Sequence, residues 1–129
     1  MIKLDPIIAV KNVEESSKWY QDIFGLKSKH GGEEFDVLAD TNDNIILCLH
    51  KWGEHNHPTM QRSNMTGGNG LILYFRTDNI ELIRENLMAK NYNVEQELKL
   101  SPNSLKREFS LRDRDGYYIT IAEYHNYSG

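Results

Sequence analysis

The sequence is poor in the residues that make sulfur-based cross-links. Of its 129 residues, only Cys48 is a cysteine, which excludes an internal disulfide and a cysteine-rich zinc site. It also lacks a long apolar run, and its N-terminus is not a basic segment followed by an apolar one. These absences predict a cytoplasmic protein with no signal peptide and no membrane-spanning segment.

An excess of basic residues is also missing. There are 15 Lys and Arg residues against 19 Asp and Glu residues, which gives a net charge of −4 and a pI near 5.7. Nucleic-acid binding needs clustered Lys and Arg to displace counterions, so this balance argues against a nucleic-acid partner. The chain shows no serine nucleophile elbow, glycine-rich phosphate loop or paired-carboxylate motif.

What the chain does have is a clear hairpin pattern near its C-terminus, over 109–124. Asp115-Gly116 supplies the residue pair that tolerates the positive φ of a tight turn. In the second strand Ile119 and Ile121 point to one face of the sheet, because side chains alternate along a strand. The other face is amphipathic and carries Tyr118, Thr120, Ala122 and Tyr124.

The first half of the chain predicts a strand, a helix and three strands. Strands are expected over 4–11, 26–30, 35–39 and 45–50. The helix begins after Asn12, whose side chain can cap it, and ends at Gly25. In the last strand alternation places Ile45, Leu47 and Leu49 on one face and Ile46, Cys48 and His50 on the other.

The second half repeats this order after a segment without apolar periodicity, 51–69, which predicts a long linking loop. Strands are expected over 70–76 and 92–100, followed by the hairpin. Between the first two, Asp78 is expected to cap a helix that ends near Asn91.

The chain is therefore predicted to be an α+β protein built as an internal repeat of two βαβββ modules. An offset of about 66 residues relates the first strands and the helices, and one of about 72 relates the closing strands. One such module cannot bury its sheet face alone. We expect one domain over 1–129, with modules at about 1–51 and 70–129 and the loop 52–69 between them. Helices would lie outside, and the mixed sheet would curl around a cleft.

Several motifs resemble the vicinal oxygen chelate superfamily, which includes glyoxalase, bleomycin-resistance proteins and extradiol dioxygenases. The resemblance covers nearly the whole chain. It is carried by the motifs over 8–13, 19–26 (with Trp19-Tyr20 and Phe24-Gly25-Leu26), 75–80 and 107–116. The last is close to the family's aspartate-proline-aspartate-glycine turn, although Arg114 stands where the proline is common.

The resemblance implies a sheet curled around a cleft, a homodimer and, in metal-dependent members, ligands on the first and last strands of each module. Here those positions fall at or near Pro6, Cys48, Ile72 and Thr120. A divalent metal needs three or more converging imidazole or carboxylate ligands. Only Cys48 could bind a metal strongly, so no metal or other cofactor is expected at these positions.

The expected ligand-binding residues lie on the amphipathic strand faces or near their ends. His50 is either a binding or basic group or a solvated histidine at a strand end. Aromatic rings could stack on a planar ligand, or else fill the cleft or a dimer interface. Cys48 is either a cleft thiol or a small buried hydrophobe, and Glu108 either a cleft charge or a surface residue. The full set is Cys48, His50, Trp52, Tyr74, Glu108, Tyr118, Thr120 and Tyr124.

Other polar residues are expected to be ordinary surface groups. Glu54, His55 and His57 look metal-like, but a His-x-His pair in a loop lacks a rigid third partner, and only a chance nickel or zinc site is open to it. His30 and His125 have no visible partners in the sequence. The turn residues Arg112, Asp113 and Asp115 are interpreted as surface charges.

The leading hypothesis is a metal-free cleft protein that binds a small organic molecule, as bleomycin-resistance proteins sequester an antibiotic. The acidic balance suits an aromatic or cationic compound. The alternative is a glyoxalase-like lyase or isomerase, or a dioxygenase, with an unconventional site made by His50 and the 51–69 loop. A third hypothesis is a scaffold whose cleft is filled by its own side chains, with Tyr74, Tyr118 and Tyr124 collapsed together.

Overall fold

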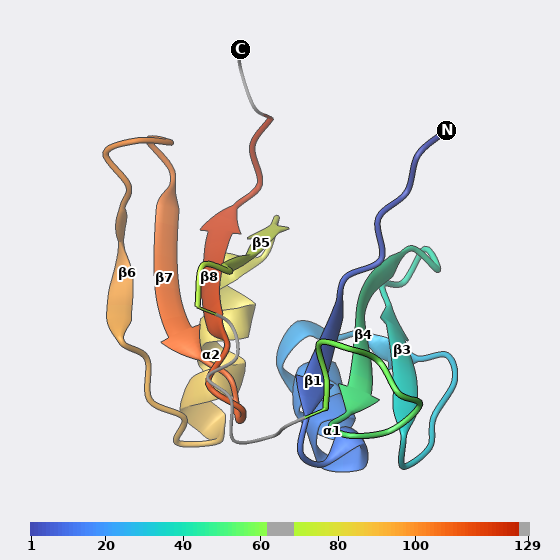
Figure 1. Cartoon of the computed structure of the whole chain (residues 1–129). Coiled ribbons are helices and arrows are strands. Elements are labelled where there is room, and N and C mark those ends of the chain that lie inside the picture. Colours follow the sequence, from blue (N-terminus) through green and yellow to red (C-terminus); the bar gives the residue numbers. More distant parts are fainter. Residues whose placement is uncertain (62–68, 127–129) are drawn as a thin grey trace. The chain divides into compact units, whose positions relative to one another are not determined.

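Each half of the chain folds as a strand, a helix and three further strands (Figure 1). The computed structural model describes residues 1–61 and 69–126. It divides into Met1–Thr66, here called the N-unit, and Gly67–Gly129, here called the C-unit. Part of the predicted linking loop, 62–68, and the last three residues of the predicted second module lie outside the described residues.

The N-unit is a four-stranded mixed sheet with one helix. Its elements are β1 (Ile7–Val10), α1 (Val13–Phe24), β2 (Lys27–Ser28), β3 (Phe35–Ala39) and β4 (Ile45–Lys51). The strand order is β1-β4-β3-β2, in which β1 and β4 are parallel and the other neighbours antiparallel. In Figure 1, α1 lies behind this sheet.

The C-unit repeats the topology. Its elements are β5 (Leu73–Thr77), α2 (Ile80–Ala89), β6 (Gln96–Leu100), β7 (Arg107–Arg112) and β8 (Tyr118–Glu123). The order is β5-β8-β7-β6, with β5 parallel to β8 and the other pairs antiparallel. The α+β class and the duplicated βαβββ arrangement predicted from the sequence are therefore confirmed.

Local signals placed the first helix correctly. The Asn12 side-chain oxygen accepts a hydrogen bond from the Glu15 backbone N–H at 2.9 Å, and Gly25 ends α1 with a left-handed φ of 70°. The start of α2 was predicted one residue too early. Its N-cap is Asn79 rather than Asp78, and the Thr77 hydroxyl accepts from the Asn79 backbone N–H instead.

Four strands are shorter than predicted. The predicted strand 4–11 is reduced to β1, Ile7–Val10. For two of the others the backbone shows why. The predicted strand 26–30 is reduced to β2 because the chain turns at Gly31 and Gly32, whose φ values are 73° and 131°. The predicted strand 92–100 begins only at Gln96, since the Tyr92 backbone N–H donates to the Leu87 carbonyl and closes α2. The predicted strand 70–76 becomes Leu73–Thr77.

The alternation of apolar residues gives each unit its own core. Ile119 and Ile121 of β8 are fully buried, as are Leu38 and Leu49 in the N-unit. The turn charges were partly misjudged, because Asp113 is buried and its carboxylate accepts from the backbone N–H groups of Asp115 and Tyr117. Across the described ranges, neither helix is long and apolar enough to cross a membrane.

Candidate functional site

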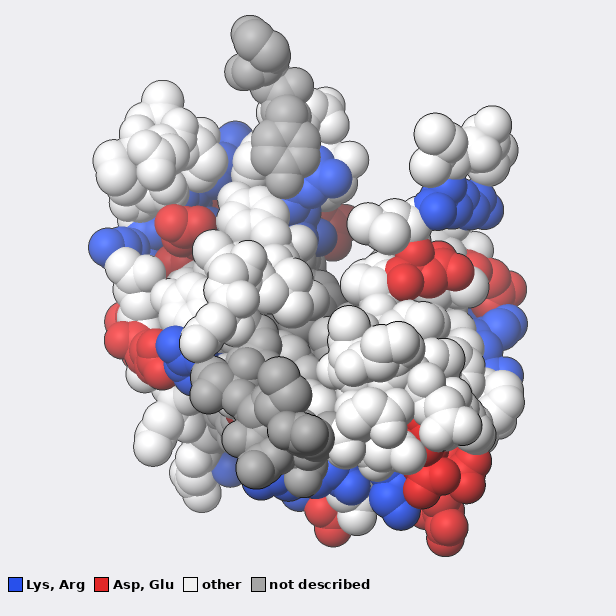
Figure 2. All heavy atoms as spheres, in the orientation of Figure 1, with Lys and Arg blue, Asp and Glu red and all other residues white. Residues whose placement is uncertain are grey.

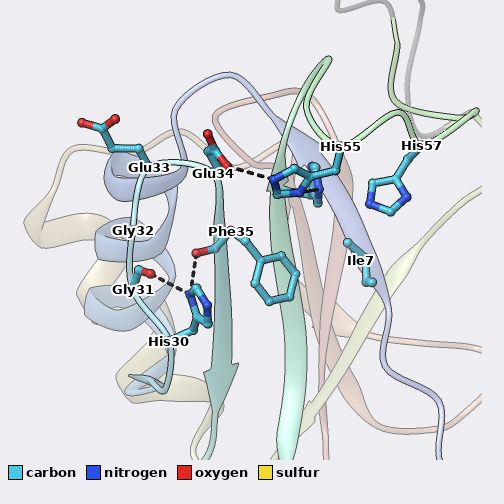
Figure 3. Close-up of a pocket in the computed structure, with 10 residues that line it drawn as sticks. Ile7, His30, Gly31, Gly32, Glu33, Glu34, Phe35, His55 and His57 are labelled. Atoms are coloured by element: carbon cyan, nitrogen blue, oxygen red, sulfur yellow. Dashed lines mark hydrogen bonds and ion pairs between the residues drawn. The ribbon is translucent and has the colours of Figure 1, made fainter.

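A pocket of about 580 Å³ opens on the sheet of the N-unit (Figure 3). Strand pairing explains its floor: Phe35 lies opposite His50 in the antiparallel β3–β4 ladder, so both side chains emerge on one face. Figure 3 shows Ile7, Phe35, His55 and His57 on the same side of the sheet. The full lining is Ile7, His30, Gly31, Gly32, Glu33, Glu34, Phe35, His50, His55 and His57.

The turn over 30–34 forms one wall of this pocket. The Nδ1 atom of His30 lies 2.7 Å from the Gly31 carbonyl oxygen and 3.2 Å from that of Phe35. A ring nitrogen facing two carbonyls must carry the proton and donate. The ring is thereby held against Phe35, with 5.3 Å between centroids. His30 is exposed, as expected from the sequence, but it has partners, which are backbone atoms that sequence reasoning could not locate.

A buried carboxylate, Asp36, holds that wall to the rest of the N-unit. Asp36 is 2% exposed and accepts hydrogen bonds from the hydroxyls of Ser17 and Ser28. It also accepts from the backbone N–H groups of Gly31 at 2.7 Å and Val37 at 2.8 Å. Burial alone would raise the pKa of the Asp36 carboxyl, but these hydrogen bonds together lower it below its ordinary value. One carboxylate thus joins α1, β2, β3 and the pocket turn.

Three imidazoles gather at this pocket. One ligand nitrogen from each of His50, His55 and His57 lies within 4.8 Å of the others. The Nε2 atom of His50, which is buried, is 3.3 Å from Nδ1 of His55. Nε2 of His55 in turn lies 2.9 Å from the Glu34 carboxylate. No rigid third partner for His55 and His57 was recognised in the sequence. In the structure that partner is His50, from strand β4.

The segment after β4 is shaped to present these rings. His55 and Asn56 both adopt left-handed backbone conformations, with φ of 62° and 55°, which are uncommon for residues other than glycine. The Met60 backbone N–H donates to the His57 carbonyl at 3.0 Å, and the Gly53 backbone N–H donates to the Met60 carbonyl. The buried Met60 side chain anchors the turn. The loop that the sequence predicted therefore has a defined conformation over 52–61.

Two predicted binding residues of the N-unit lie beside this pocket without lining it. Cys48 is buried next to β1. Burial raises the pKa of its thiol most, and the nearby negative charges of Asp5 and Asp36 raise it further. A thiol that stays protonated at neutral pH is a poor nucleophile. Trp52 is half-buried, and its backbone N–H donates to the Val10 carbonyl at 3.3 Å.

In the C-unit the structure brings Tyr74 and Glu108 together. They line a pocket of about 400 Å³ with Ser101, Asn103, Ser104, His125 and Asn126. The Tyr74 hydroxyl lies 3.0 Å from Nε2 of His125, so His125 also has a partner that the sequence did not reveal.

The other predicted residues of the C-unit are not among those that line that pocket. Tyr124 lines a different pocket, of about 350 Å³, with the Arg76 guanidinium 5.1 Å from its ring centroid. Tyr118 lies under Arg112 at 5.2 Å, and the buried Thr120 shares a 3.0 Å hydrogen bond with Ser110. The hypothesis that Tyr74, Tyr118 and Tyr124 collapse together stays a prediction.

The family-derived ligand positions need one correction. The Cys48 backbone N–H donates to the Pro6 carbonyl, which makes this pair neighbours on adjacent strands. In the C-unit, however, Thr120 lies beside Tyr74 rather than Ile72, because β5 begins at Leu73. Ile72 is 59% exposed and outside the strand. Neither version of the set contains an imidazole or a carboxylate.

Figure 2 shows one face of the molecule, on which Lys and Arg side chains and Asp and Glu side chains occur in small groups among uncharged residues.

Comparison with known proteins identifies the family of this chain. The model of the Glyoxalase/Bleomycin resistance protein/Dioxygenase superfamily matches residues 3–121. Among curated proteins, the search finds no match. Solved structures with the same fold include a lactoylglutathione lyase from Agrobacterium tumefaciens, with 17% identity, a TM-score of 0.71 and coverage of 95% of this chain and 92% of that one.

Two further structures are similar at the level of the fold. TioX from Micromonospora sp. ML1 is 16% identical, with a TM-score of 0.72 and coverage of 97% of this chain and 100% of that one. A glyoxalase/bleomycin resistance protein/dioxygenase family enzyme from Burkholderia phytofirmans PsJN is 16% identical, with a TM-score of 0.74 and coverage of 92% and 95%. Because the family model spans most of the chain, this protein belongs to the glyoxalase/bleomycin resistance protein/dioxygenase superfamily.

Proposed function

We propose that this protein binds a small organic molecule in the N-unit pocket. The observation that supports the proposal is the pocket itself, about 580 Å³, in which Ile7 and Phe35 lie beside several imidazole and carboxylate side chains. Pockets that hold small ligands have volumes of roughly 300–1,000 Å³. Members of the superfamily to which the chain belongs are typically small-molecule-binding proteins.

The lining indicates what kind of molecule fits. Phe35 offers an aromatic ring and Ile7 an aliphatic side chain for a planar, apolar part. Glu33 and Glu34 supply negative charge at the rim, which favours a cationic group on the same ligand. Sequestration of an aromatic, cationic antibiotic is the finer form of this proposal. The proposal also includes a cytoplasmic location and assembly as a homodimer. Exposed apolar side chains such as Leu71 and Ile72 offer surface for a contact between two copies of the chain.

A thermal-shift screen of the untagged protein against aromatic cations, glutathione adducts and glycopeptide-type antibiotics tests the proposal. A ligand that binds only the folded state raises the melting temperature according to its affinity and concentration. For a ligand found in this way, we expect Phe35→Ala to weaken the Kd by at least about tenfold, because a buried aromatic contact is lost.

The matched control is Tyr74→Ala, which removes an aromatic ring from a pocket of the C-unit. It is expected to leave the Kd within about twofold of the parent value, a difference of well under 1 kcal/mol. A ligand whose affinity falls with Tyr74→Ala and not with Phe35→Ala would place the binding site outside the N-unit pocket and contradict the proposal.

A second candidate function is a metal-dependent lyase or isomerase, or a dioxygenase. The observation that favours it is the approach of His55 and His57 to His50, because three imidazoles are the donor set of many catalytic metal sites. One solved structure of the same fold is a lactoylglutathione lyase. This candidate stands only if the imidazoles hold a metal ion.

A further inference from the structure

The hydrogen bonds around His50 and His55 fix which nitrogens carry protons. Nδ1 of His50 lies 2.8 Å from the Lys51 carbonyl oxygen, which can only accept, so that nitrogen must donate. Nε2 of His55 faces the Glu34 carboxylate and must donate as well. A neutral imidazole has only one N–H. When both rings are neutral, the two remaining nitrogens, Nε2 of His50 and Nδ1 of His55, therefore both present lone pairs. A proton on either of these nitrogens would join them in a hydrogen bond, and a metal ion can take the place of that proton.

Those two lone pairs face each other across 3.3 Å. Two acceptors at that separation repel unless a cation lies between them. The spacing also matches a metal, since two nitrogen ligands at about 2.0–2.1 Å from a tetrahedral zinc ion lie about 3.3–3.4 Å apart. A third imidazole, that of His57, stands next to the pair, with 4.7 Å between its centroid and that of His50.

The outer partners of these rings are those that metal-binding histidines use. Such histidines donate their second ring N–H to a carboxylate or a backbone carbonyl, which orients the ring and makes it a better ligand. Here His55 has the Glu34 carboxylate and His50 the Lys51 carbonyl. His50 comes from a rigid strand and is 3% exposed, whereas His55 and His57 are exposed and can adjust.

We propose that His50 Nε2, His55 Nδ1 and a ring nitrogen of His57 bind one divalent transition-metal ion, with zinc as the reference ion. Imidazole ligands suit zinc, copper, iron and nickel. All three residues line the N-unit pocket, so a fourth coordination position would open toward it. The inference rests on the proposed function in one respect: the organic ligand of the pocket, or a water molecule, would occupy this fourth position. This site differs from the family-derived positions at which the sequence predicts no metal, and its third ligand comes from β4.

The test uses untagged protein stripped with a chelator and titrated with zinc chloride against a chromogenic competitor. One zinc per chain is expected, with a Kd on the order of micromolar or lower. His55→Gln and His57→Gln, both at exposed positions, should each weaken the Kd by about tenfold or more. Glu34→Gln, which changes only the outer partner of His55, should weaken it by about 10–100-fold.

His125→Gln is the matched control, because it alters a half-buried imidazole of the C-unit, outside both the cluster and the N-unit pocket. Its zinc affinity should stay within about twofold of the parent. Weak, substoichiometric zinc binding, or equal affinity in the parent, His55→Gln and His57→Gln, would overturn the inference. An organic ligand that still binds the zinc-free protein in a Phe35-dependent way would show that the proposed function stands while the metal site does not. Zinc binding by a protein that binds no organic ligand would show that the metal site stands while the proposed function does not.

Discussion

Replacing Asp36 with alanine is expected to lower the free energy of unfolding by about 3–5 kcal/mol. The carboxylate is 2% exposed and accepts from the hydroxyls of Ser17 and Ser28. It also accepts from the backbone N–H groups of His30, Gly31 and Val37. Without it, two hydroxyls and three backbone N–H groups lose their acceptor in a site from which water is largely excluded. Urea denaturation followed by circular dichroism measures the change. Ligand binding in the N-unit pocket should weaken too, because Asp36 holds the turn that forms one wall.

The control for this variant is Asp43→Ala, which removes an exposed carboxylate paired with Lys27 and Lys29. Exposed ion pairs contribute little to stability, so the denaturation midpoint should hardly move. A large loss with Asp43→Ala, or none with Asp36→Ala, would contradict the role assigned to Asp36.

The same carboxylate predicts a pH dependence. Its pKa is lower in the folded protein than the ordinary value of 3.8, so its contribution is complete above that value. The contribution is lost as the pH falls below 3.8 and through the folded pKa. The stability difference between the parent and Asp36→Asn should therefore be constant near neutral pH and shrink in that acidic range.

Replacing Leu49 with alanine is expected to destabilise the protein by about 2–5 kcal/mol, because it leaves a cavity in the core of the N-unit. Leu49 is fully buried in β4 and, by the alternation of side chains, points away from the face that carries His50. The variant therefore loosens the strand that positions His50 without touching the pocket.

Ile45→Ala is the control in the same strand, since Ile45 is 43% exposed. Truncating it should cost less than about 1 kcal/mol. Urea denaturation compares the two variants directly. Equal losses would mean that β4 is not supported by the core contact assigned to Leu49.

Local signals in the sequence predicted much of the fold. Asn12 and Gly25 act within one turn of the chain, and β3 was predicted with the bounds that the structure shows. Errors arose where a distant group decides a boundary. Tyr92, for example, closes a helix through the Leu87 carbonyl, and its hydroxyl donates to the Arg112 carbonyl.

The candidate site was less predictable because it depends on strand register. His50 was correctly placed on a face with Cys48, but nothing in the sequence said that Phe35 lies opposite it or that Glu34 bonds to His55. Pairing 35–39 with 45–51 without a bulge would set Phe35 opposite Leu49. The register shift between Leu38 and Ala39, which the sequence does not reveal, sets Phe35 opposite His50 instead. The conformation of His55 and Asn56 left no comparable signal.

Chemical-shift mapping by NMR is the most direct test of whether the N-unit pocket is the binding site. The backbone amides of the isotope-labelled protein are followed while the organic ligand from the thermal-shift screen is added. The account predicts the largest shifts at Gly31, Gly32, Glu34 and Phe35, with saturation at one ligand per chain. Shifts concentrated instead at Ser101, Ser104, Glu108 and His125, the pocket of the C-unit, would contradict it.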